Sequence, residues 1–77
     1  MHAQVIAFGQ IKEITGPAPI LLQDVQDTEE VIARMHQLYP QLSGLVYVLA
    51  IDKHIVREKT VLKDNATIAL LPPYSGG

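Results

Sequence analysis

A chain of 77 residues forms one small domain, with little room for the deep cleft of a self-sufficient enzyme. Hydrophobic residues make up 48% of it, which excludes an intrinsically disordered protein, and the absence of cysteine excludes a disulfide scaffold, a cysteine nucleophile and thiolate metal sites. The net charge of −2 comes from well-mixed charges with no basic stripe, so we expect no nucleic-acid or membrane partner. No charged-then-apolar signal segment opens the chain, and we expect a cytoplasmic location.

Strand-forming and turn-forming residues alternate over the first third of the chain. Residues 1–8 predict a strand that stops at Gly9. Residues 9–16 predict one short helical turn, because Gly16 and Pro17 break it. Residues 19–25 predict a second strand, which makes a hairpin-like pair with the first.

One amphipathic helix is predicted from Asp27 or Thr28 up to Pro40. Asp27 and Glu30 have the spacing of a capping box, in which each side chain satisfies a free backbone amide of the first turn. One apolar stripe follows at helical spacing, formed by Val31, Ile32, Met35 and Leu38. A proline ends the pattern, since the residue before it avoids the helical region.

The second half predicts three further strands, at residues 45–51, 54–57 and 67–71, separated by polar turns. The order β-β-α-β-β-β places one main helix on one face of a mixed sheet, which is a two-layer α+β fold. It is the β-grasp, or ubiquitin-like, arrangement. We assign residues 1–71 to this domain and residues 72–77 to a projecting C-terminal tail.

The tail begins with two prolines and ends with two glycines. Its sequence, starting from the last strand residue, is Leu71-Pro72-Pro73-Tyr74-Ser75-Gly76-Gly77. Prolines lack the donor that a sheet ladder needs and favour an extended path. Six residues at about 3.3 Å each reach roughly 20 Å from the domain. Gly76 and Gly77 lack Cβ atoms and can therefore pass through a narrow channel of a partner.

The terminal carboxylate is the only reactive group that such a tail offers. A carboxylate is a poor electrophile, but an enzyme can convert it into an acyl adenylate, and a sulfur nucleophile can then displace the adenylate to leave a thiocarboxylate. Sulfur carried on the C-terminus suits a chain without cysteine. The chain has no phosphate-binding glycine loop, so we expect that it binds no cofactor and that an activating partner uses the ATP.

Over almost its whole length the sequence resembles the sulfur-carrier (small) subunits of molybdopterin synthase, the MoaD branch of the MoaD/ThiS family. Four stretches carry the resemblance: Phe8 followed by Gly9-Gln10-Ile11-Lys12-Glu13, the capped helix from Thr28, Val48-Leu49-Ala50-Ile51-Asp52, and Ala69-Leu70-Leu71-Pro72-Pro73-Tyr74-Ser75-Gly76-Gly77. The last stretch is the specific one. The sequence departs from the usual pattern in four places. Lys12 replaces the commoner Arg, Asp52 replaces a frequent Asn, Tyr74 replaces a small aliphatic residue, and Leu70-Leu71 are less aromatic than in some members.

The resemblance implies a mechanism and a set of partners. An E1-like enzyme adenylates Gly77, a sulfur donor supplies the thiocarboxylate sulfur, and the large synthase subunit transfers it to a pterin precursor. Gly77 is then the reacting residue of a non-catalytic subunit, and the partner-binding residues are Leu71, Pro72, Pro73, Tyr74, Ser75 and Gly76. The resemblance also implies a heterotetramer, in which an apolar face of the sheet and the inserted tail contact the large subunit.

Three other functions remain open at this stage. The first is sulfur delivery to thiamine or another metabolite. The second is modification of proteins through isopeptide bonds at Gly77, and the third is a plain binding module with an incidental tail. The spacing of His2, His36 and His54 predicts no metal site.

Overall fold

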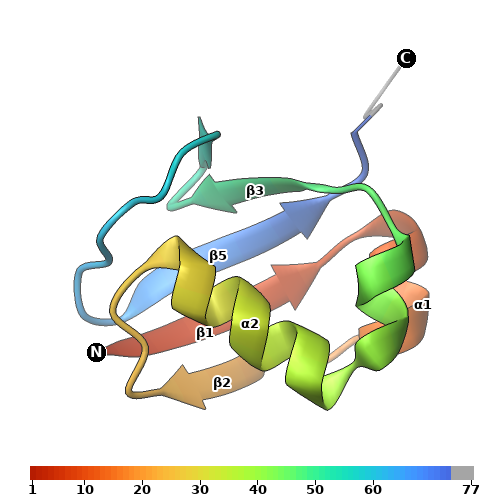
Figure 1. Ribbon diagram of the computed structural model, residues 1–77, viewed down its shortest axis with the longest axis horizontal. Coiled ribbons are helices and arrows are strands. Elements are labelled where there is room, and N and C mark those ends of the chain that lie inside the picture. The colour runs from red at the N-terminus through yellow and green to blue at the C-terminus, as the bar shows by residue number, and fades with distance from the viewer. Residues whose placement is uncertain (74–77) are drawn as a thin grey trace.

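The computed structural model describes residues 1–73 of the chain. Its elements in chain order are β1 (His2–Ala7), α1 (Gly9–Thr15), β2 (Ile20–Gln23), α2 (Thr28–Leu38), the 3-10 helix η1 (Pro40–Gly44), β3 (Val48–Ile51), β4 (His54–Val56) and β5 (Ala66–Leu71). The strands form one mixed sheet in the order β2-β1-β5-β3-β4. β1 and β5 run parallel, and the other neighbouring strands are antiparallel. The predicted order and the β-grasp arrangement are confirmed (Figure 1).

The core lies between the sheet and α2, which crosses one face of it (Figure 1). Every second residue of β5 points to this side, so Ala66, Ile68 and Leu70 are buried. From α2, Val31 and Met35 are fully buried against them. The methionine of the predicted apolar stripe is therefore a core residue, as expected.

The N-terminus of α2 is held as the sequence predicts. The Glu30 amide donates a hydrogen bond to Asp27 Oδ1 at 2.9 Å, which caps the first turn. The Glu30 carboxylate reaches back, but it accepts from the Gln26 amide, at 2.9 Å, rather than from the amide of the cap residue. These two hydrogen bonds satisfy the backbone amides of Glu30 and Gln26 and set where the helix begins.

The strand predicted for residues 45–51 is shorter in the structure. It begins only at Val48, because the chain before it leaves η1, a 3-10 helix that was not predicted. Pro40 ends the pattern of α2 and also opens η1, since its fixed φ and missing amide suit the first turn of a helix. One proline thus ends one helix and starts the next.

Candidate functional site

The last described residues, Pro72 and Pro73, follow a central strand of the sheet. β5 lies between β1 and β3, and Leu71, its last residue, is paired with Val48 of β3. Leu71 and Pro72 are half-buried and Pro73 is exposed. The chain leaves β5 at the end of the sheet where α1 lies (Figure 1). A central strand paired on both sides gives the tail a rigid base.

Four of the predicted site residues, Tyr74, Ser75, Gly76 and Gly77, lie outside the described residues. The other three, Leu71, Pro72 and Pro73, follow one another at the end of β5. The described part of the site is therefore the root of the tail and the surface around it.

The face of the sheet that α2 does not cover is largely apolar. We call it the helix-free face; its apolar residues are Ile6, Phe8, Leu21, Val48, Ala50, Ile55, Ala69 and Leu71. The strand registers place Ile6 beside Ala69, Ala69 beside Ala50, and Ala50 beside Ile55, which makes one row across four strands. Leu21, Ile55 and Phe8 expose 74%, 56% and 45% of their surface. A row of apolar side chains across four strands, together with three exposed large apolar side chains on the same face, is typical of a protein-docking surface.

A shallow hollow of about 350 Å³ lies on the helix-free face. Its lining residues are Ile6, Phe8, Asp52, Lys53, Thr67 and Ala69. Asp52 and Lys53 form the two-residue turn between β3 and β4, with φ angles of 47° and 75°. Such a turn requires positive φ at both positions and continues the twist of the strands. The turn places one anion, Asp52, and one cation, Lys53, at the rim of a mainly apolar hollow.

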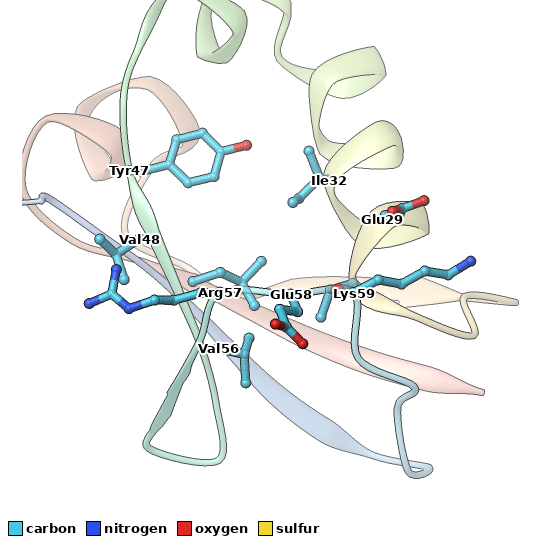
Figure 2. Close-up of a pocket in the computed structure, with 10 residues that line it drawn as sticks. Glu29, Ile32, Tyr47, Val48, Val56, Arg57, Glu58 and Lys59 are labelled. Atoms are coloured by element: carbon cyan, nitrogen blue, oxygen red, sulfur yellow. The ribbon is translucent and has the colours of Figure 1, made fainter.

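A second hollow, of about 430 Å³, lies between α2 and the β3–β4 edge of the sheet (Figure 2). In Figure 2 the Tyr47 ring points towards α2, whereas the side chains of Arg57 and Lys59 point away from each other. The Tyr47 hydroxyl and His36 Nε2 are hydrogen-bonded at 2.7 Å, and burial raises the pKa of Tyr47. Tyr47 also packs against the core.

Residues 1–73 contain no group of three or more His, Asp or Glu side chains that could hold a metal ion. Nor is any helix in this range long and apolar enough to cross a membrane. The histidines have other contacts: His2 with Asp64, His36 with Tyr47, and His54 with the Asp52 carbonyl oxygen.

The family resemblance implies an apolar docking face of the sheet, but the sequence alone does not show which residues form it. The alternation of β5, with Thr67, Ala69 and Leu71 between buried neighbours, was a usable signal for one strand. The row of Ile6, Ala69, Ala50 and Ile55 depends on strand registers that join distant segments, and no local pattern shows these.

Comparison with known proteins adds sequence relatives. The model of the ThiS family matches residues 5–77. The molybdopterin synthase sulfur carrier subunit of Chlamydomonas reinhardtii is 31% identical over 83 aligned residues. The alignment covers 100% of this chain and 100% of the relative. The molybdopterin synthase sulfur carrier subunit of Dictyostelium discoideum is 30% identical over 81 residues, which cover 96% of this chain and 94% of the relative.

Solved structures agree on the fold. One chain of the protein–protein complex of subunits 1 and 2 of molybdopterin-converting factor from Helicobacter pylori 26695 matches with a TM-score of 0.77 and 30% identity, at 100% coverage of both chains. The small archaeal modifier protein SAMP1 from Methanosarcina acetivorans matches with a TM-score of 0.84, 23% identity and coverage of 99% and 96%. At that identity the second likeness shows the β-grasp fold alone. The family match and the full-length relatives show that this chain belongs to the ThiS family, as the resemblance implied.

Proposed function

We propose that this chain is the sulfur carrier subunit of a molybdopterin synthase, with Gly77 as the residue that carries the sulfur. The full-length likeness, at 30% and 31% identity, to two molybdopterin synthase sulfur carrier subunits carries the proposal. The apolar helix-free face and the tail root on a central strand fit it, because a carrier must dock and then extend its end into a partner.

The chemistry proceeds at the terminal carboxylate. A carboxylate oxygen of Gly77 attacks the α-phosphorus of ATP and pyrophosphate leaves, which gives an acyl adenylate. A sulfur nucleophile then attacks the carbonyl carbon and AMP leaves, so that the end becomes a thiocarboxylate. Its sulfur is passed to the pterin precursor, and water returns Gly77 to a carboxylate. An E1-like enzyme and a sulfur donor supply the first steps, and the large synthase subunit supplies the last.

The proposed assembly uses the helix-free face and the tail. The large subunit covers the helix-free face, and residues 72–77 enter its active site as a tail that extends beyond the domain of residues 1–71. Pro72 and Pro73 restrict the free tail, which reduces the conformational entropy lost on insertion. Two carriers and two large subunits would make a heterotetramer, and we place this assembly in the cytoplasm.

An intact-mass assay tests the proposal. The chain is incubated with an E1-like activating enzyme, ATP and a sulfur source. The expected product is heavier by the exchange of one oxygen for one sulfur, and fragmentation places the change on Gly77. A chain that lacks Gly77 is the control and should gain nothing. Absence of any mass gain in the wild-type chain would contradict the proposal.

A binding assay separates the proposed product from the alternatives. Stable association with the large subunit of a molybdopterin synthase, and not with a thiazole synthase, is the expected result. The reverse preference would assign the carrier to thiamine synthesis. Gly-Gly remnants on lysines of other proteins after trypsin digestion would instead indicate a protein modifier. The SAMP1 likeness gives no reason to prefer that function, since it shows the fold alone.

A further inference from the structure

We propose that Gly9 is a positioning residue for the C-terminal tail. It leaves the space that the Pro72 ring occupies, and this contact sets the direction in which the chain leaves the domain. The inference rests on the proposed function, because the direction matters only if Gly77 must reach a reacting atom in a partner. Gly9 itself touches no reacting group and acts only through Pro72.

The contact leaves no room for a side chain at Gly9. A Cβ atom at this position would lie 2.6 Å from Pro72 Cγ and 3.6 Å from Pro72 Cδ, whereas ordinary contacts of a Cβ lie at 3.4–4 Å. The φ angle of Gly9 is +59°, in the left-handed region that favours glycine. Two independent features therefore require glycine here, and only the steric one concerns the tail.

Gly9 is itself exposed, but the chain is held on both sides of it. The Phe8 amide donates to the Leu70 carbonyl oxygen at 3.0 Å, which continues the pairing of β1 with β5 up to Gly9. On its other side Gly9 begins α1, which is anchored by the buried Ile11. Pro72 is only half-buried, and the exposed Pro73 follows it. An added methyl group would therefore displace the root of the tail and leave α1 in place.

Pro72 cannot absorb that displacement with its side chain alone. Its ring closes on its own backbone nitrogen, so Cγ moves only by a change of ring pucker and cannot swing away as the end of a long side chain can. Restoring an ordinary contact requires a movement of about 1 Å, which the backbone must share. The movement then changes the direction of the chain at Pro72 and Pro73.

The direction matters because a partner holds the domain and the reacting carbon at separate places. Docking at the helix-free face fixes the domain, and the five residues after Pro72 span at most about 17 Å. A misplacement of about 1 Å at a reacting centre can lower a rate by up to about a hundredfold. The Gly9–Pro72 contact fixes the direction of the tail before it enters the partner's active site, and so limits misplacement of the reacting carbon.

The test compares Gly9→Ala with Gly16→Ala. Gly16 has a φ angle of +90°, so alanine is strained there as well, but no atom lies within 4 Å of its would-be Cβ. Both variants should lower the melting temperature. With an activating enzyme, ATP and a sulfur source, we expect Gly9→Ala to lower kcat for thiocarboxylate formation about tenfold or more, with KM changed by less than about twofold. Gly16→Ala should match the wild type per folded molecule.

A double variant tests whether the loss of kcat in Gly9→Ala has a steric cause. Pro72→Ala removes Cγ and Cδ and leaves only Cβ, which lies 3.9 Å from the added methyl group. The double variant Gly9→Ala/Pro72→Ala should therefore recover much of the kcat lost in Gly9→Ala. If Gly9→Ala fails to fold, Pro72→Ala alone removes the same contact without strain at Gly9. It should then lower kcat in the same direction, by a smaller factor.

A measurement without any partner distinguishes failure of this inference from failure of the proposed function. In the wild-type chain, NMR should show nuclear Overhauser contacts between the Gly9 Hα and Pro72 Hγ protons. The Leu71 amide shift should change in Gly9→Ala and stay unchanged in Gly16→Ala. Absence of these contacts, or equal kcat in the two alanine variants, would overturn the inference while sulfur loading of the wild type stands. A wild-type chain that gains no sulfur overturns the proposed function, and the NMR comparison still decides whether Gly9 positions the tail.

Discussion

Asp52 and Thr67 are joined by two hydrogen bonds where the ladder between β3 and β5 ends. The Asp52 amide donates to the Thr67 carbonyl oxygen at 2.8 Å, and the Thr67 amide donates to Asp52 Oδ1 at 3.0 Å. β3 ends at Ile51, so the Asp52 carboxylate accepts the hydrogen bond of the Thr67 amide in place of a backbone carbonyl of β3. It also ties the β3–β4 turn to the central strand that carries the tail.

The first prediction concerns this side chain. Asp52→Ala removes the acceptor and places alanine at a φ angle of 47°, and it should lower the free energy of unfolding by about 1–2 kcal/mol. Asp52→Asn keeps an acceptor and tolerates positive φ, so it should stay within about 0.5 kcal/mol of the wild type. Urea unfolding of both variants measures the difference. Equal stability of the two would show that the side-chain bond contributes nothing.

The second prediction concerns Lys53, the other residue of the turn. Its φ angle of 75° is strained for a residue with a Cβ, and turns of this type favour glycine there. Lys53→Gly should therefore raise the free energy of unfolding by about 0.5–1 kcal/mol, which raises the melting temperature by about 2–8 °C in a domain of this size.

The control for Lys53 is Lys63→Gly. Lys63 is also an exposed lysine outside the helices and strands, but it is not among the residues with positive φ. Glycine there only adds freedom to the unfolded chain and should not stabilise the fold. If both variants behave alike in a thermal scan, strain in the turn is not the cause.

The third prediction follows from the contact between His2 and Asp64. The His2 amide donates to Asp64 Oδ1 at 2.8 Å and, together with the nearby imidazole, it holds the pKa of Asp64 below its ordinary value of 3.8. A carboxyl whose pKa is lower in the folded than in the unfolded state stabilises the fold above the unfolded-state pKa. That stabilisation is lost as the pH falls through the folded-state pKa.

Urea unfolding of the wild type and of Asp64→Asn tests this pH dependence of stability. The midpoints are measured from neutral pH down to the lowest pH at which the protein folds. Their difference should be constant above the ordinary carboxyl pKa and should shrink as the pH falls below it. The effect is small, since the pair is exposed to solvent and screened by salt. A difference that grows towards acid pH would contradict the assignment.

The fourth prediction concerns the helix-free face. Ile55 exposes 56% of its surface there, and Leu38 exposes 51% on α2, on the other side of the sheet. Ile55→Ser should weaken binding to the large synthase subunit about tenfold or more, because an apolar anchor is lost from the docking surface. Leu38→Ser removes a similar exposed area and should leave the dissociation constant unchanged.

Isothermal titration calorimetry with the purified large subunit gives both constants for this comparison. Thermal unfolding of the free variants shows whether either substitution acts through stability. A larger loss of affinity for Leu38→Ser than for Ile55→Ser would move the docking surface to the helix side.

Local patterns were sufficient for the helix α2. Its capping residues, its apolar stripe and its terminating proline all lie within one short stretch, and the predicted limits agree with Thr28–Leu38. The strands were located less well. The predicted strand at residues 45–51 includes three residues before Val48, because apolar composition alone does not show where pairing with β5 begins.

The sequence by itself determined the order of elements, the capped helix and the diglycine end, because each depends on the chemistry of neighbouring residues. Only the tertiary structure decided which apolar residues share the helix-free face and that the Pro72 ring lies against Gly9. These relationships join segments that are distant along the chain, since β5 pairs with β1 from the other end of the sequence. The register of that pairing, which the whole core stabilises, sets where the tail begins.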